Sequence, residues 1–341
     1  MNDICGAIRR GIYVACIAAL AVGSAVAPTA AQEKRDPTKA SYAKTLKGKK
    51  VVWIAVTMGN DLQTEWEKNF RQIAESVGME FSLRDANFNA EAQTQAMEAV
   101  INEKPDLLIV QSINVNSLAR LIKRAQSDGI PVIQLNMKSL QDSAGFVGAD
   151  YVGIGEQIAR EIVAQCKPEK GRTGKVALIQ GDPSGADSYL QMEGINRVLA
   201  DNPQIKIVSN QAGMWDPNKA RDITATVLQQ NPDLCAAVGM WGVMSMGVAQ
   251  AIKEAGLQGK VLHYSNDGGA RYMCDAVKSG AVTKFWSYNA PGQARDVMQL
   301  AIYLLQNPQR WQNLSGALFS PMDVLSADNV ADGLCYDPAK R

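Results

Sequence analysis

Two stretches of this 341-residue chain repeat the same order of predicted secondary-structure elements. Each has a buried strand, a polar loop, a helix and a strand, then Pro-Asp, another strand, a loop, a helix, a glycine turn and a strand ending in Asn. The first stretch spans residues 50–136 and the second spans residues 174–266. Alternating strands and helices predict a parallel sheet with helices on both faces. A plan that is used twice therefore predicts two similar doubly wound α/β lobes.

The N-terminus has the layout of a secretory signal peptide. Arg9 and Arg10 precede an apolar run from Ile12 to Ala27, and small residues lead to Ala31, after which the chain becomes polar. The run has about 16 residues, fewer than the ~20 that a membrane-spanning helix needs. We therefore expect a signal peptide over residues 1–31 with cleavage near Ala31, an N-terminal extension over 32–49, and an exported, soluble mature chain.

Composition and motifs argue against several classes of function. The net charge is +1, and acidic and basic residues are mixed along the chain, which does not favour nucleic acid as a partner. The chain has one histidine, His263, in a predicted strand, and no Cys-x-x-Cys pair, so we expect no metal site. The loop after the first strand, residues 57–61, has one glycine where a dinucleotide cradle needs several, so we expect no cofactor. Because nucleophile elbows and acid–base pairs are also missing, we expect no enzymatic activity.

The ends of the predicted strands are the candidates for a binding site. Open α/β sheets bind ligands beyond the carboxyl ends of their strands, so two facing sheets would form a cleft. Amides offer both donors and acceptors to hydroxyl groups, and aromatic rings cover the C–H faces of a sugar or polyol. The residues at these positions are Thr57 to Gln63, Gln111, Ser112, Asn136 to Lys138, Asp182 to Tyr189, Trp215, Trp241, Asn266 and Asp267, with Tyr288 as a further ring.

The chain resembles the periplasmic substrate-binding proteins of sugar ABC importers, in the ribose-type cluster of the type I fold. The resemblance covers roughly residues 50–325 and rests on the order and spacing of the segments "IAVTMGNDLQTEWEKNFRQIAESVGMEF", "PDLLIVQSINVNSLARLIKRAQSDGIPVIQLN", "GFVGADYVGIGEQIARE", "MWDPNKARDITATVLQQNPDLCAAVG" and "VLHYSNDGGARYMCDAVKSGAVTKFW". It implies three crossings between lobes, near 148–151, 288–291 and 320–323. The first lobe would contain residues 50–149 plus 290–321, and the second 150–289 plus 322–341.

The resemblance also implies which residues contact a ligand. The Asp-Arg pair with which the family grips sugar hydroxyls is replaced by Asn136 and Met137, and among the implied positions only Asp267 keeps a charge. A less hydroxylated, neutral or more apolar ligand therefore becomes plausible, such as a deoxy sugar, a polyol, a glycoside or an aromatic compound. The implied ligand-binding set is Asn60, Leu62, Gln63, Gln111, Asn136, Met137, Tyr189, Trp215, Trp241, Asp267 and Tyr288.

The expected function is that of a monomeric, non-enzymatic solute-binding protein of the periplasm. It would capture a sugar or sugar-like neutral ligand by hinge closure and deliver it to an inner-membrane ABC permease. An alternative within the same class is a sensor that presents its ligand to a chemoreceptor or a kinase. A transcriptional repressor with this effector fold would need a helix-turn-helix before the first lobe, where this chain has an export signal.

Four cysteines follow the expected cleavage point: Cys166, Cys235, Cys274 and Cys335. An even number in an oxidising compartment permits two disulfides in three possible pairings, and free buried thiols are the alternative. Cys166 ends a second-lobe helix and Cys235 begins a strand whose edge would neighbour it, so these two are candidates for one bridge. Cys274 and Cys335 can pair if the C-terminal tail folds back on the same lobe.

Overall fold

Two six-stranded sheets organise the computed structural model, which describes residues 37–331 and 333–339. The pairings within the described chain are parallel except that between β10 and β12. In spatial order, the first sheet contains β2 (Glu80–Asp85), β1 (Lys50–Ala55), β3 (Leu107–Val110), β4 (Val132–Leu135), β5 (Gly145–Gly148) and β11 (Gly316–Phe319). The second contains β7 (Lys206–Ala212), β6 (Lys175–Gln180), β8 (Ala236–Met240), β9 (Leu262–Asp267), β10 (Lys284–Ser287) and β12 (Asp323–Ser326).

The two sheets have the same strand order, which confirms the predicted pair of similar α/β lobes; they differ at one edge, where β11 is parallel to its neighbour and β12 is antiparallel. In each, the second strand of the lobe, β2 or β7, lies at one edge and its last strand, β11 or β12, lies at the other. Both sheets belong to the compact unit Ser41–Arg341. The predicted signal peptide and part of the predicted extension fall outside the described residues, where the structure does not test them.

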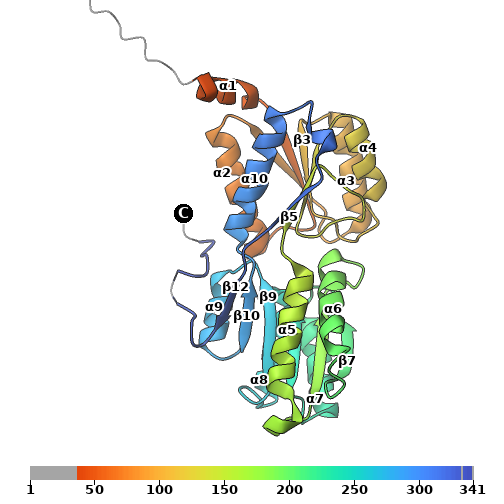
Figure 1. The fold of residues 1–341 in the computed structure, drawn as a ribbon, viewed down its shortest axis with the longest axis vertical. Coiled ribbons are helices and arrows are strands. Elements are labelled where there is room, and N and C mark those ends of the chain that lie inside the picture. Colours follow the sequence, from red (N-terminus) through yellow and green to blue (C-terminus); the bar gives the residue numbers. More distant parts are fainter. Residues whose placement is uncertain (1–36, 332, 340–341) are drawn as a thin grey trace, which may run out of the picture. The chain divides into compact units, whose positions relative to one another are not determined.

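Helices cover the sheets as the alternation predicts, and in the first lobe α2 and α10 lie on one face while α3 and α4 lie on the other (Figure 1). Within the described residues, no helix is long and apolar enough to cross a membrane. The helices are α1 (Pro37–Leu46), α2 (Asp61–Ser76), α3 (Ala90–Glu103), α4 (Ala119–Ser127), α5 (Tyr151–Cys166), α6 (Ala186–Leu199), α7 (Pro217–Gln230), α8 (Gly242–Glu254), α9 (Arg271–Lys278) and α10 (Ala290–Gln306), with 3₁₀ turns η1 (Pro168–Lys170) and η2 (Trp311–Asn313).

The central strands are buried on both faces, as parallel strands between two helical layers must be. In β1, Val51 and Trp53 join the cluster that contains Trp66 and Phe70 of α2. Their neighbour Ile54 points the other way, into the cluster formed with α3 and α4. Because successive strand residues face opposite sides, this one continuous apolar run fills two layers of core.

The chain passes between the sheets three times, at the positions that the family resemblance implies. The first passage follows Gly148, where β5 of the first sheet ends and α5 begins. The second follows Ser287 at the end of β10 and leads through α10, which packs against α2 of the first lobe. The third is the short link from Phe319 to Asp323, between β11 and β12. The chain therefore crosses between the two sheets three times; the predicted lobe boundaries and hinge motion stay predictions.

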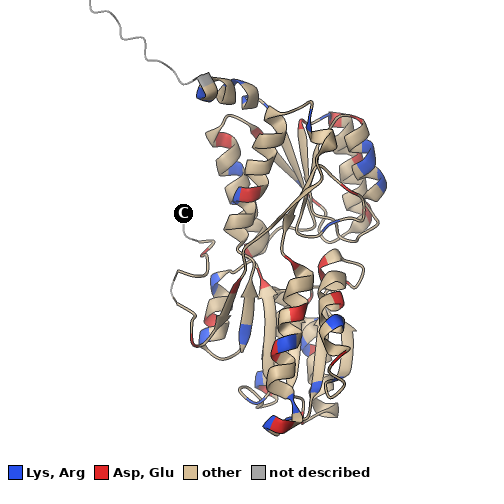
Figure 2. Ribbon diagram, in the orientation of Figure 1, with Lys and Arg blue, Asp and Glu red and all other residues tan. Residues whose placement is uncertain are grey.

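Charged residues are interspersed over the helices of both lobes (Figure 2). Many of the ion pairs are local, such as Arg71 with Glu67 and Arg197 with Glu193, both one helical turn apart. Exposed pairs of this kind contribute little to stability. The mixture of both signs agrees with the +1 net charge of the sequence.

Two disulfide bonds lie in the second lobe. Cys166 at the end of α5 is joined to Cys235 just before β8, and Cys274 in α9 is joined to Cys335 in the C-terminal tail. Their Cα atoms are 5.8 and 6.1 Å apart, within the range of protein disulfides. The second bond holds the tail beside α9, where the backbone N–H of Arg271 also donates to the carbonyl of Tyr336 at 2.8 Å.

Removing the Cys166–Cys235 bond should destabilise the second lobe. The cysteines are 69 residues apart in sequence, so the chain-entropy model predicts a loss of about 4 kcal/mol in the free energy of unfolding. The measurement is urea unfolding of the Cys166→Ala/Cys235→Ala double variant beside the natural protein, both without reductant. A double variant as stable as the natural protein would contradict the expected contribution of this bond.

Candidate functional site

A small cavity of about 30 Å³ lies between the two lobes, at the carboxyl ends of their strands. Gln111 follows β3, Asn136 follows β4 and Trp241 follows β8, each directly after the last residue of its strand. The lining residues are Val56, Leu62, Gln63, Phe88, Gln111, Asn136 and Met137 of the first lobe, and Tyr151, Asp187, Trp215, Trp241 and Tyr288 of the second.

Most of the ligand-binding residues predicted from the sequence come together in this cavity. They derive from both lobes and from loops far apart in the chain, as the cleft hypothesis requires. Their contact with a ligand stays a prediction. The predicted residues on the cavity wall are Leu62, Gln63, Gln111, Asn136, Met137, Trp215, Trp241 and Tyr288.

Three predicted residues do not line the cavity. Asn60 instead caps α2, where its side-chain oxygen accepts a hydrogen bond from the backbone N–H of Gln63 at 3.3 Å. Tyr189 is 55% exposed, on the outer side of the first turn of α6. Asp267 is buried and accepts hydrogen bonds from the Tyr272 hydroxyl group at 2.5 Å and the Gly268 N–H at 2.7 Å. Asp267 therefore lies beside the cavity wall, where burial raises its pKa to about 6.

Four lining residues were absent from the predicted set: Val56, Phe88, Tyr151 and Asp187. Val56 directly follows strand β1, and Tyr151 lies at the first crossing between the lobes. The topology alone identifies both positions. Phe88 follows the edge strand β2, whose carboxyl end was not considered. Asp187 lies within the loop-to-helix segment 182–189 that the sequence did place at the cleft.

Several lining residues have a backbone conformation that is unfavourable for residues other than glycine. The φ angles of Phe88, Asn136, Trp215 and Trp241 are 55°, 58°, 63° and 75°. Positive φ is uncommon for such residues and is a true outlier for bulky ones, and it often occurs at functional sites. Here all four residues follow a strand end by one to three positions and line the cavity.

A glycine makes room for the indole ring of Trp215. A Cβ atom on Gly181, at the end of β6, would overlap the six-membered part of that ring. The ring therefore lies directly against the backbone of the strand end. Since no other residue lacks a Cβ atom, Gly181 is needed for this position of Trp215.

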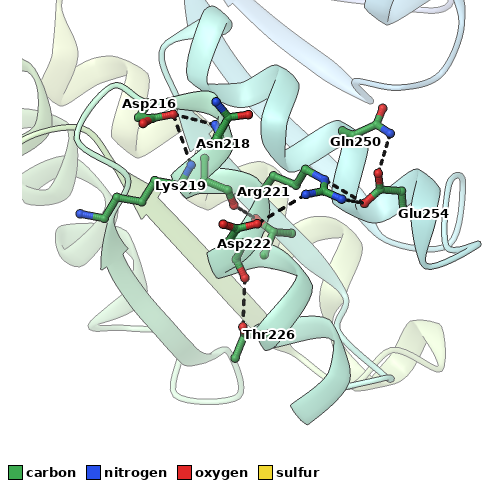
Figure 3. Close-up of polar contacts among 10 residues, drawn as sticks. Asp216, Asn218, Lys219, Arg221, Asp222, Thr226, Gln250 and Glu254 are labelled. Atoms are coloured by element: carbon green, nitrogen blue, oxygen red, sulfur yellow. Dashed lines mark hydrogen bonds and ion pairs between the residues drawn. The ribbon is translucent and has the colours of Figure 1, made fainter.

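Helix α7 begins two residues after Trp215, with a side-chain cap (Figure 3). The next residue, Asp216, caps α7 by accepting hydrogen bonds from the backbone N–H groups of Asn218 at 2.7 Å and Lys219 at 3.3 Å. Helix α7 is tied to α8 by the ion pair of Arg221 with Glu254, at 2.8 Å. Because Trp241 immediately precedes α8, the same helix pair positions both tryptophans.

The aromatic rings meet at steep angles and form a corner. Trp215 and Trp241 are edge-to-face, with ring centroids 5.9 Å apart and planes at 84°. Phe88 of the first lobe meets Trp241 at 6.4 Å and 66°. Tyr151 and Tyr288 form another edge-to-face pair at 6.1 Å. A ligand in the cavity would therefore face rings on more than one side.

Buried hydrogen bonds orient the amides of the first lobe. The side-chain oxygen of Asn136 accepts from the backbone N–H of Ala149 at 2.9 Å and from Gln293 Nε2 of α10 at 3.2 Å. Gln93 of α3 donates to the carbonyl of Gln111 at 2.7 Å and accepts from the N–H of Ile113 at 3.1 Å. These bonds hold the loops after β3 and β4 in place without a ligand.

Three acceptor oxygens on the cavity wall have no hydrogen-bond donor among the described residues. They are Oε1 of Gln63, Oε1 of Gln111 and Oδ1 of Asp187, and all three are shielded from water. Desolvation and, to a smaller extent, the nearby carboxylate of Asp182 raise the pKa of Asp187 to about 7. A buried acceptor without a partner costs about 1–3 kcal/mol, so a ligand that donates hydrogen bonds here would remove this cost.

The lobes also touch each other directly beside the cavity. The backbone N–H of Val115, beyond β3, donates to the carbonyl of Ser184, beyond β6, at 3.1 Å. Val56, Ile113 and Met137 of the first lobe form an apolar cluster against which Trp215 of the second lobe packs. The structure therefore describes a closed arrangement in which walls from both lobes surround one space.

The single histidine does not line the cavity. His263 is 1% exposed; its Nε2 lies 2.7 Å from the hydroxyl group of Ser245, and its Nδ1 lies 2.8 Å from the carbonyl oxygen of Ala281. Burial lowers its pKa to about 4, so the ring is neutral at pH 7. A neutral ring that donates to the carbonyl and accepts from the hydroxyl group satisfies both partners, as expected of a packed residue.

Comparison with known proteins assigns the family. The model of the periplasmic binding protein domain matches residues 51–309, which is most of the chain. The chain therefore belongs to the periplasmic binding proteins, and its two-lobed structure is the type I fold of that family.

Individual relatives and structures agree with this assignment. The D-allose-binding periplasmic protein of Escherichia coli (strain K12) is 29% identical over 235 residues, 65% of this chain and 75% of that protein. The D-ribose/D-allose-binding protein of Pseudomonas aeruginosa is 23% identical over 300 residues, 85% of this chain and 93% of that protein. A crystal structure of a carbohydrate transporter solute-binding protein from Agrobacterium radiobacter, in complex with D-arabinose, has a TM-score of 0.77 at 16% identity, covering 85% of this chain and 99% of that one.

Substituting Gly181 by alanine should displace the Trp215 ring. The added Cβ atom overlaps the ring, so we expect a loss of about 1–3 kcal/mol in the free energy of unfolding and a shifted tryptophan emission spectrum. The control is Gly316→Ala, where a Cβ atom meets nothing within 4 Å and the loss should stay within about 0.5 kcal/mol. Equal stability of the two variants in urea unfolding would show that Trp215 does not depend on Gly181.

Substituting Asp187 by asparagine should stabilise the ligand-free protein at alkaline pH. The pKa of Asp187 is raised from 3.8 to about 7, so the ionised carboxyl group lowers the free energy of unfolding as the pH rises through this window. At pH 8 the variant should gain up to about 4 kcal/mol, at 1.36 kcal/mol per pKa unit, and near pH 4 the gain should vanish.

This pH dependence is measured as the difference in melting temperature between Asp187→Asn and the natural protein from pH 4 to pH 8. The control is Asp142→Asn, which changes an exposed carboxyl group on a loop. A difference that stays constant across this range would contradict the raised pKa of Asp187.

Proposed function

We propose that this protein captures a sugar or sugar-like solute in the periplasm and delivers it to an ABC permease in the inner membrane. The observation that carries the proposal is the cavity itself, whose walls come from the strand ends of both lobes and combine amides with aromatic rings. Amides bind hydroxyl groups and rings cover C–H faces, which is the chemistry that sugar recognition needs. The relatives named above are described as binding D-allose and D-ribose, which supports the same ligand class.

Capture would proceed by closure of the hinge. In the closed arrangement the cavity is bounded by Gln63 and Gln111 from one lobe and by Trp215 and Trp241 from the other. Rotation about the three crossings would separate these walls and let the ligand enter. The bound ligand would then stabilise the closed form, which is the form that a permease would recognise, and the ligand would leave chemically unchanged.

A panel of ligands tests this proposal by thermal shift. A ligand at 100 times its dissociation constant should add about 2.7 kcal/mol to the free energy of unfolding and raise the melting temperature by several degrees. The panel contains free sugars, deoxy sugars, polyols, glycosides and small aromatic compounds. We expect at least one sugar or polyol to raise the melting temperature.

The Gln63→Ala/Gln111→Ala variant places the binding in the cavity, because it removes two of its unpartnered acceptors. It should bind the same ligand at least tenfold more weakly. The control is Gln95→Ala, an exposed substitution on α3. No thermal shift with any sugar or polyol, or an equal shift in both variants, would refute capture of such a ligand in this cavity.

A further inference from the structure

We infer that the ligand of this cavity carries a protonated amine on its polyhydroxylated frame, so that the protein binds amino sugars or amino polyols in preference to neutral sugars. The inference rests on the proposed function and specifies its ligand class. It differs from the neutral ligand that the sequence predicts, because the structure places a different carboxylate at the site. Asp187 lines the cavity, whereas Asp267, the one charged residue of the predicted set, does not.

The charge of the cavity wall is uncompensated. Asp187 is the only charged residue in the lining, and no lysine or arginine lines the cavity within the part of the chain that the structure describes. The charged group that acts on it is another carboxylate, Asp182. A neutral sugar would donate a hydrogen bond to Asp187 but would leave its negative charge unpaired, whereas an ammonium group would supply the missing counter-ion.

The aromatic corner is also suited to a cation. The ring planes of Trp215 and Trp241 lie at 84° to each other and those of Phe88 and Trp241 at 66°, so these three lining rings do not share one plane. Sugar stacking needs one flat face against the ring of the sugar, whereas a cation is attracted to several ring faces at once. Tryptophan is the strongest partner in such interactions, and two of these three rings are tryptophans.

The unpartnered hydrogen-bonding atoms of the cavity wall also favour an ammonium group. The unpartnered lining atoms Gln63 Oε1, Gln111 Oε1 and Asp187 Oδ1 are all acceptors. An ammonium group has three donors and no acceptor, and so matches an acceptor-rich wall. Hydroxyl groups on the rest of the ligand can use the remaining amide and tyrosine groups of the lining, which include Asn136 and Tyr288.

Isothermal titration calorimetry with matched pairs tests the inference. The pairs are D-glucosamine with D-glucose, D-galactosamine with D-galactose, D-mannosamine with D-mannose, and 1-amino-1-deoxy-D-sorbitol with D-sorbitol. At pH 7.5 we expect at least one amine to bind 30-fold or more tightly than its hydroxyl counterpart. Binding of neutral members without a preference for any amine overturns the inference and leaves the proposed function standing. No binding by either member of any pair overturns both.

A second pair of ligands tests the effect of positive charge alone, because neither ligand contains a sugar whose configuration affects binding. Choline and 3,3-dimethyl-1-butanol have nearly the same shape but differ in charge. We expect choline to quench the tryptophan fluorescence with a dissociation constant at least tenfold lower than that of the alcohol. Equal constants for the two compounds would overturn the assignment of the rings and Asp187 as a cation site.

The variant Asp187→Asn separates the carboxylate from the other contacts. It should weaken binding of the preferred amine by about 100-fold and reduce the preference over the hydroxyl counterpart to threefold or less. The control Asp142→Asn, on an exposed loop, should bind the amine as the natural protein does. Retention of the full preference in Asp187→Asn, in a variant whose melting curve shows that it is folded, would overturn the role of Asp187.

Discussion

The parallel direction of neighbouring strands is the constraint on which the rest of this structure depends. In a parallel sheet all carboxyl ends lie along one edge, so the residues that follow β1, β3 and β4 are brought together although more than 20 residues separate them in sequence. The second sheet has the same strand order and does the same for the residues that follow β6, β7 and β8. Three crossings then hold the two edges toward each other, and the cavity results from this arrangement.

The wall of the cavity is held in position at a conformational cost. Four lining residues have positive φ, and strained residues of this kind cost of order 1–3 kcal/mol each. The surrounding structure offsets this cost with the cap at Asp216, the close packing of the Trp215 ring on Gly181 and the buried side-chain hydrogen bonds of Gln93 and Asn136. Rings and amides that are already oriented lose little entropy when a ligand binds, which favours affinity.

Sequence patterns predicted the fold well because they reflect constraints that repeat along the chain. The repeated order of strands and helices predicted two similar α/β lobes, and the two sheets share one strand order. The strand ends followed from the same patterns and, together with the family positions, supplied most of the cavity wall. The two disulfides connect cysteines that the sequence had only offered as candidate pairs.

The direction of individual side chains was harder to predict, and the charge of the site depends on it. Asp187 and Tyr189 are two residues apart in α6, which rotates them by about 200° around the helix axis. One faces the cavity and the other faces solvent, and the family position had favoured Tyr189. Asp267 is the last residue of β9, at the carboxyl edge of the sheet that borders the cavity. Its carboxylate, however, accepts hydrogen bonds from Tyr272 and Gly268 and lies beside the cavity wall. The direction in which a side chain leaves its helix or strand decides whether a carboxylate faces the cavity, and sequence periodicity does not resolve that direction.

The most direct test of the account is a crystal structure of the protein with its tightest-binding ligand. The account predicts electron density for the ligand enclosed between the lobes, with ring faces of Trp215 and Trp241 against it and hydrogen bonds to Gln63, Gln111 and Asp187. Density at another place on the molecule, or a ligand held by one lobe with the cavity between the lobes unfilled, would contradict it.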